Sequence, residues 1–239
     1  MSRQVPNFAS ISAVSSSFSI LKRVFLGSQR SSKNFDRSSF ESYLPQGVRL
    51  ESTETREKYD AITIAQTSLA KILDCYFSQL YFEGPWFLDF SPNSFVQAGT
   101  TIYWCPRSFE YELPEDLRTS LRKLYCSYFQ FDDEGFAEAL LELRLAKNND
   151  SLSELKSILL DHLMNARTHQ VEPDFIHLAK SSLRLFGYFV KHNIRVQPEL
   201  EPFSYSLVSL YRCLRESEEP IDFQKAFKIA HKRNHNRTK

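Results

Sequence analysis

The chain of 239 residues contains only six glycines, which leaves little material for a glycine-rich phosphate-binding loop. Neither GxGxxG nor GxxxxGK[ST] occurs in the sequence, so the two common nucleotide-binding loops are absent. No apolar run reaches the roughly 18 residues that a transmembrane helix needs. These absences argue against Rossmann-type and P-loop enzymes and against a membrane-spanning protein.

Cysteine and histidine are present without a redox or metal-binding pattern. The four cysteines form no CxxC pair, and no HExxH motif occurs. His162, His169 and His177 are near one another in the sequence, but their separations fit no usual zinc spacing. We therefore expect buried thiols in a reducing compartment and no metal site.

The composition is that of a folded chain with unevenly distributed charge. Hydrophobic residues make up 42% of the chain and aromatic residues 14%, which excludes disorder of the whole. Residues 1–35 carry five basic and no acidic residues, and residues 225–239 carry six basic and again no acidic ones. Residues 36–224 hold 19 basic and 29 acidic residues. We therefore predict a flexible Ser-rich basic segment 1–45, a helical domain 46–224 and a basic tail 225–239.

The basic ends allow two interpretations. They can attract an anionic membrane surface or nucleic acid, or they can be solvated ends that improve solubility. Segment 1–35 is also Ser-rich and acid-poor, which is typical of an organellar transit peptide and equally of a bacterial chain with a frayed start. We expect a cytoplasmic protein that can be peripheral to a membrane, with a mitochondrial or plastid location as the alternative. A protein or lipid partner is expected, and a nucleic-acid partner is not.

The periodicity of the first half predicts one long helix and one hairpin. Apolar residues recur at three- and four-residue steps from Ile62 to Leu80, which is typical of an amphipathic helix. Between Phe95 and Trp104 the period changes, and Gly99 stands where a tight turn is needed. The sequence therefore predicts a helix over 62–80 and a short hairpin near 95–104.

From Pro114 onward the pattern is helical. Pro114 is followed by acidic residues, a favourable first turn, and Asp132 or Asp133 can cap the next helix. Ser151 and Glu154 have the spacing of a capping box. Three later apolar stripes follow prolines: Leu178, Leu185, Phe186 and Phe189; Phe203, Leu207, Leu210 and Leu214; and Phe223, Ala226 and Phe227. The predicted fold class is mainly α with one short β-hairpin.

One segment resembles a known family. Residues 79–94 read QLYFEGPWFLDFSPNS, and after the predicted hairpin residues 113–118 read LPEDLR. This layout is similar to the catalytic segment of the UbiB/AarF (ADCK-type) atypical kinase-like family, with Gln79, Gly84, Asp89 and Pro92 in register. The resemblance covers roughly residues 55–225 and implies a kinase-like C-lobe. It also implies an association with isoprenoid-quinone or lipid metabolism at a membrane.

The resemblance assigns roles to three residues. Asp89 falls on the catalytic-loop aspartate, and Asn93 and Ser94 fall at or beside the metal-binding asparagine. The position of the metal-binding DFG aspartate reads Trp104-Cys105-Pro106-Arg107, and the family's KxGQ motif is missing. Because Mg²⁺ in such sites depends on one or two carboxylates, we expect a non-catalytic, degenerate relative without a cofactor.

Two alternatives stay open. One is a residual enzyme that handles Mg-ATP weakly through Asp89 and Ser94. The other is a helical protein-interaction module unrelated to kinases, in which Asp89 caps a turn. Nucleotide binding separates the first alternative from the pseudokinase prediction, and the fold around residues 84–107 bears on the second.

Overall fold

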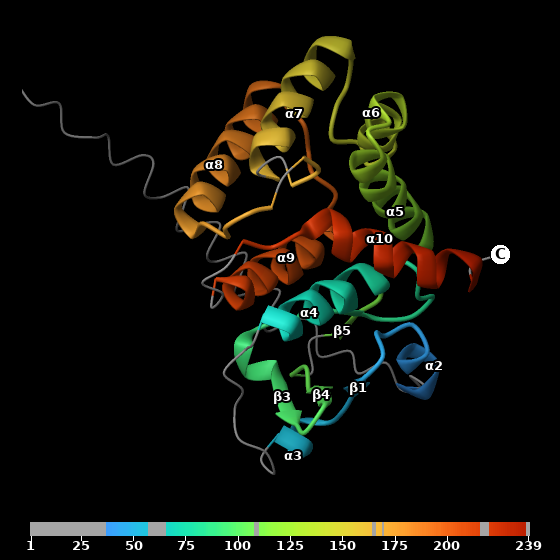
Figure 1. Cartoon of the computed structure of the whole chain (residues 1–239). Helices are drawn as coiled ribbons and strands as arrows, with labels where there is room; N and C mark the ends of the chain where they lie inside the picture. The colour runs from blue at the N-terminus through green and yellow to red at the C-terminus, as the bar shows by residue number, and fades with distance from the viewer. Residues whose placement is uncertain are drawn as a thin grey trace, which may run out of the picture.

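The computed structural model describes residues 37–56, 66–107, 110–163, 166–168, 170–215 and 220–237. These residues are mainly helical, as the periodicity predicts (Figure 1). Residues 1–36 of the predicted flexible segment lie outside these ranges, as do residues 62–65 of the first predicted helix. The helices run in the order α2 (Arg37–Glu41), α3 (Thr53–Arg56), α4 (Gln66–Ser78), α5 (Glu115–Gln130), α6 (Asp133–Glu142), α7 (Asn149–His162), α8 (Phe175–Lys191), α9 (Glu201–Leu214) and α10 (Phe223–Asn234).

Helix α4 lies at the centre, between α9 and α10 on one side and a small sheet on the other (Figure 1). Its residues Leu69, Leu73 and Phe77 are each at most 1% exposed, because helices and sheet cover it from several directions. The aromatic-rich composition fills this core with ring contacts, such as Phe77 against Phe227 of α10 at 5.4 Å between centroids.

The predicted hairpin is confirmed, but the sheet is larger than predicted. Strands β3 (Phe95–Ala98) and β4 (Thr101–Trp104) pair antiparallel around Gly99, whose φ of 59° suits glycine. Strand β1 (Val48–Leu50) adds to β4 in parallel, and β2 (Trp86–Phe87) pairs with β5 (Glu110–Tyr111). These strands of two or three residues are too short for an alternating pattern to reveal them.

Two predicted boundaries need correction. Phe40 of α2 is fully buried and Leu44 is 4% exposed, so the packed domain begins before residue 46. Most of the predicted tail 225–239 forms α10, which packs along α4. The side chains of Ala226, Phe227 and Ala230 are buried there, and four of the tail's basic residues therefore belong to a core helix: Lys225, Lys228, Lys232 and Arg233.

Short polar residues begin the later helices. Asp132 caps α6 through the Gly135 N–H, as predicted, and Asp174 and Asp222 cap α8 and α10. The capping box of α7 is formed by Asn148 and Ser151, which corrects the predicted pairing of Ser151 with Glu154. A 3₁₀ turn, η2 (Pro198–Leu200), precedes α9, and η3 (His235–Arg237) follows α10.

Candidate functional site

Asp89, the predicted catalytic-loop residue, is buried and holds its own loop together. Its Oδ1 accepts hydrogen bonds from the Ser91 backbone N–H at 3.1 Å and from the Ser91 hydroxyl at 2.6 Å. Its Oδ2 accepts from the Arg107 backbone N–H at 3.1 Å. Arg107 lies in the segment where the resemblance places the metal-binding aspartate, so the carboxylate ties the loop to that segment. This geometry is that of a turn-capping aspartate.

Ser94 lies in the same loop and Asn93 lies at its surface. The loop's 3₁₀ turn, η1 (Pro92–Ser94), places the buried Ser94 hydroxyl where it donates to Ser91 O at 2.7 Å and to Asp89 O at 3.1 Å. Trp104 Nε1 also donates to Asp89 O, at 3.0 Å. Asn93 is exposed. The structure therefore brings Asp89 and Ser94 together as parts of one hydrogen-bonded loop.

Gln79 and Arg118, at the two ends of the resembling segment, are in contact. Arg118 is 1% exposed; it donates from Nη1 to Gln79 O at 2.6 Å and from Nη2 to Gly84 O. The Gln79 side-chain oxygen accepts from the Phe87 N–H at 2.6 Å. Burial lowers the pKa of Arg118 to about 10, which leaves it charged at neutral pH. These two residues fix the start of the loop that carries Asp89.

A second polar cluster joins α10 to the rest of the core. The Tyr81 hydroxyl lies 2.7 Å from His231 Nδ1, and Cys126 Sγ lies 3.8 Å from both of these atoms. Burial raises the pKa values of Tyr81 and Cys126 and lowers that of His231, so all three are held neutral. A neutral thiol and a neutral phenol make this cluster a structural contact.

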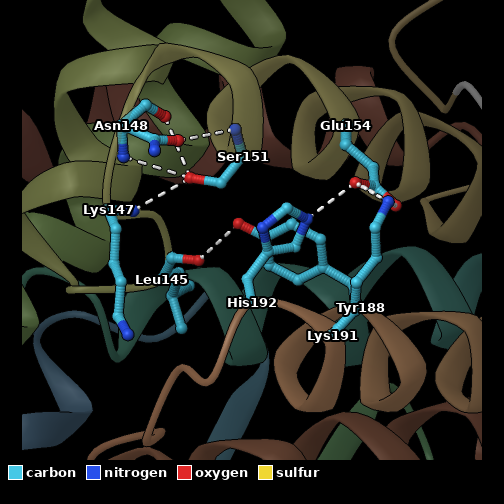
Figure 2. A network of polar contacts seen from close by, with 8 residues as sticks. All are labelled: Leu145, Lys147, Asn148, Ser151, Glu154, Tyr188, Lys191 and His192. Carbon is cyan, nitrogen blue, oxygen red and sulfur yellow. Dashed lines mark hydrogen bonds and ion pairs between the residues drawn. The ribbon is translucent and has the colours of Figure 1, made fainter.

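Helices α7 and α8 are joined by a third polar network, which Figure 2 shows from close by. Glu154 of α7 accepts from Lys191 Nζ at 2.8 Å and pairs with His192 Nε2 at 2.7 Å. These hydrogen bonds, that from Lys191 foremost, lower the pKa of Glu154. The buried Tyr188 hydroxyl donates to Leu145 O at 3.1 Å. This network joins α7 to the C-terminal end of α8.

An open groove of about 710 Å³ runs between α7 and α8. Its volume is within the range of small-molecule sites. Gly187 lies on its α8 side, and a Cβ added there would meet no atom within 4 Å. The groove carries both charges and hydroxyls, and its lining residues are Asp150, Ser153, Glu154, Ser157, Ile158, Arg184, Gly187, Tyr188 and Lys191.

The apolar arc of α8 extends past the side that faces the core, and its outer part points away from the core. Its inner side buries Leu178 and Tyr188 against the body. Four large apolar side chains of α8 are exposed: Ile176 by 64%, Leu183 by 60%, Phe186 by 51% and Val190 by 65%. At 100° per residue these four fall within one arc of the helix, which we call the α8 stripe. The prediction that Phe186 belongs to the core stripe is wrong, because the core covers the side of Leu178 and Tyr188 and leaves Phe186 outside it.

Sequence reasoning missed the α8 stripe although the signal is present. The apolar residues of α8 spread over about half of the helix circumference, which is wider than the side that faces the core. Residues 175–195 also contain four basic residues and no acidic one, within a body of 19 basic and 29 acidic residues. Gly187 and the side chains of Lys180, Arg184 and Lys191 border the stripe on the groove side.

Within the described ranges, no helix is both long and apolar enough to cross a bilayer. The same residues contain no group of three or more His, Cys, Asp or Glu side chains that could hold a metal ion. Comparison with known protein families and with curated protein sequences gives no match for the chain. The function is therefore argued from the residues of this chain alone.

Proposed function

We propose that this protein is a non-catalytic, kinase-C-lobe-like relative of the UbiB/AarF family that binds an anionic membrane surface through the α8 stripe. The observation that carries the proposal is the exposed apolar stripe beside a row of basic residues. An in-plane amphipathic helix on a membrane has this pattern, with Phe and Leu toward the acyl chains and Lys or Arg at the headgroups.

The arrangement of residues 79–118 supports the kinase-like part of the proposal. Helix α4 leads into the loop of Asp89, the hairpin β3–β4 follows, and α5 opens with Glu115 and Asp116. This is the order that the resemblance implies. The contact of Gln79 with Arg118 joins the two ends of the resembling segment, as expected if their pairing is an inherited feature.

The hydrogen bonds of Asp89 support the non-catalytic part. A catalytic aspartate needs a carboxylate oxygen that can reach the attacking hydroxyl. Both oxygens of Asp89 accept from the protein's own N–H and O–H groups, and the Ser94 hydroxyl donates to two backbone carbonyls. A nucleotide and its metal would have to replace these contacts.

The energetics of membrane docking favour α8 over the basic ends. Full burial of a Leu or Phe side chain contributes about 1.5–3 kcal/mol, so inserting the exposed part of each stripe residue contributes about 1 kcal/mol. Each Lys or Arg close to an anionic surface adds about 1 kcal/mol and is screened beyond a Debye length of about 8 Å. Lys180, Arg184 and Lys191 stand beside the stripe, and the pairing of Arg184 with Asp161 and of Lys191 with Glu154 reduces their net contribution. We expect modest, salt-sensitive binding.

Vesicle flotation tests the proposal with one substitution in the stripe. The full chain is mixed with phosphatidylcholine vesicles, with or without phosphatidylserine, at low and high salt. The wild type should float only with phosphatidylserine vesicles and less at high salt. Leu183→Glu should lower the bound fraction about tenfold, since it removes an apolar anchor and adds a repelled charge.

The matched control is Ile229→Glu on α10, where Ile229 is 49% exposed. It makes the same change at a similar exposure on the helix that carries the predicted basic tail. We expect Ile229→Glu to float like the wild type. Equal loss in both variants, or wild-type protein that never floats, would overturn membrane docking and favour a protein partner for the stripe.

A further inference from the structure

The groove between α7 and α8 opens directly beside the α8 stripe. Gly187 borders both features, with Leu183 and Val190 on its stripe side and Lys191 on its groove side. Because Gly187 has no side chain, no side chain of this residue separates the groove from the α8 stripe. A molecule with a polar head in the groove could therefore extend apolar chains across Gly187 onto the stripe.

The charges of the groove are arranged in two parts. Asp150 and Glu154 lie toward the start of α7, where Glu154 already binds Lys191 and His192, and Ser157 lies three residues further along, a rise of about 4.5 Å. Arg184 pairs with Asp161 of α7 through an ion pair whose side chains are 55% and 42% exposed. Exposed pairs of this kind contribute little stability, so a ligand can exchange with them at small cost.

This arrangement complements a zwitterion with a phosphate and a primary ammonium joined by a two-carbon linker. The phosphate matches Arg184 and the Ser157 hydroxyl. The ammonium, with three donors, matches the Asp150 carboxylate and takes the place of Lys191 Nζ on Glu154, which is an exposed pair of the same kind. A quaternary ammonium cannot donate and is usually bound on open aromatic faces. Tyr188 is the aromatic residue of the lining, and its ring packs against His192 with centroids 4.7 Å apart.

We propose that the α7–α8 groove is a headgroup site for a zwitterionic aminophospholipid of the phosphatidylethanolamine type. The inference rests on the proposed membrane docking of the α8 stripe and names the lipid that this face would prefer. The acyl chains of the bound lipid lie along Leu183 and Val190, and the headgroup lies in the groove. The free headgroup offers the same charges without the chains.

Flotation with matched vesicles tests this preference. Two sets contain the same fraction of phosphatidylserine, with the remainder either phosphatidylcholine or phosphatidylethanolamine. The ethanolamine lipid should raise the bound fraction of the wild type about threefold, the gain that one exposed ion pair can supply. Gly187→Leu, which fills the groove beside the stripe, should remove this gain and keep the phosphatidylserine-dependent binding.

A charge variant should change the phosphatidylserine-dependent binding and the ethanolamine gain in opposite directions. Asp150→Asn with Glu154→Gln removes two carboxylates, so binding to phosphatidylcholine/phosphatidylserine vesicles should rise while the ethanolamine gain disappears. Glu134→Gln on α6, an exposed carboxylate outside the groove, should keep the gain. If the wild type shows no ethanolamine gain, or if Gly187→Leu and the double variant retain it, the headgroup site is refuted while membrane docking stands.

A soluble short-chain phosphatidylethanolamine, used below its critical micelle concentration, keeps the two proposals distinguishable. Its NMR titration should shift the amides of Ser157, Gly187 and Lys191, and the matching phosphatidylcholine should not. Glycerophosphoethanolamine, the headgroup without chains, should shift the same amides more weakly. Shifts without vesicle binding would support the groove and refute membrane docking, and an absence of shifts with all three compounds would refute the groove.

Discussion

Helices α8 and α10 are both amphipathic and both carry basic residues, yet the protein uses them in opposite ways. Helix α10 turns Phe223, Ala226 and Phe227 into the core, where each is at most 7% exposed. Helix α8 buries one apolar side and leaves the α8 stripe in solvent. An apolar stripe therefore predicts a helix reliably, but the width of the stripe indicates whether the helix has more apolar surface than the core covers.

The basic residues of the two helices differ in the same way. Arg233 of α10 makes a bidentate ion pair with Asp74 of α4, which is 5% exposed, and donates to Tyr43 O at 3.1 Å and to Ser78 Oγ at 2.7 Å. The ion pairs of α8, Arg184 with Asp161 and Lys191 with Glu154, are exposed. The cation of α10 thus locks the fold, and the cations of α8 remain accessible to a ligand.

The largest expected difference comes from one substitution made on each helix. Phe227→Ala should lower the free energy of unfolding by about 4 kcal/mol, because it opens a cavity among packed rings. Phe186→Ala on α8 should change it by about 0.5 kcal/mol or less, as is usual for exposed positions. Urea denaturation followed by circular dichroism measures both values. Equal losses would mean that α8 is packed as tightly as α10.

The buried ion pair gives the second effect. Asp74→Ala should cost about 3 kcal/mol of unfolding free energy, because Arg233 is left without its partner in a mostly buried site. Asp161→Ala, which breaks the exposed pair with Arg184, should cost less than about 1 kcal/mol. Urea denaturation followed by circular dichroism measures both losses of unfolding free energy. A small loss in Asp74→Ala would show that α10 is anchored by its apolar face alone.

Lowering the pH should destabilise the protein through His162, a residue of α7 that contacts α8. This residue is 8% exposed, its Nδ1 lies 2.8 Å from Ser181 Oγ, and burial lowers its pKa from 6.5 to about 4. Below pH 6.5 the unfolded chain binds a proton that the folded chain does not. Stability is therefore complete above the unfolded pKa and falls by about 2–3 kcal/mol as the pH drops toward 4. His162→Gln should show a shallower pH dependence of unfolding, and identical slopes would contradict this assignment.

The smallest expected effect is the response to nucleotide. A ligand at one hundred times its Kd adds about 2.7 kcal/mol of stability, which thermal unfolding detects readily. We expect no Mg²⁺-dependent shift with ATP, because the Asp89 carboxylate and the Ser94 hydroxyl are engaged within their loop. A clear shift that disappears in Asp89→Ala would favour the residual enzyme instead.

Much of the helical body could be predicted because its signals are local. Prolines and aspartates mark helix starts within one turn, and Asp132, Pro114 and Pro173 stand at or next to the observed starts of their helices. Strand β1 could not be predicted, because its pairing with β4 joins residues 54 positions apart, such as Val48 and Ile102. The core position of Arg233 could not be predicted, since its ion pair with Asp74 joins residues 159 positions apart.

The loop of Asp89 could likewise be predicted only where its contacts join residues that are close in the sequence. Asp89 and Ser94 are five residues apart in one loop, so their proximity follows from the sequence. The hydrogen bond from Arg107 N–H comes from 18 residues away and depends on the hairpin. The α7–α8 groove depends on which sides of two helices face each other, and periodicity alone does not fix that choice.

Brominated-lipid quenching of a tryptophan placed in the α8 stripe tests the central claim most directly. Phe186→Trp and Ile229→Trp put the reporter at positions 51% and 49% exposed on α8 and α10, while the native Trp86 and Trp104 are at most 1% exposed and supply a constant background. With phosphatidylserine vesicles that contain brominated acyl chains, the fluorescence of Phe186→Trp should be strongly quenched and that of Ile229→Trp should not. Equal quenching at both positions, or quenching at neither, would contradict docking through α8.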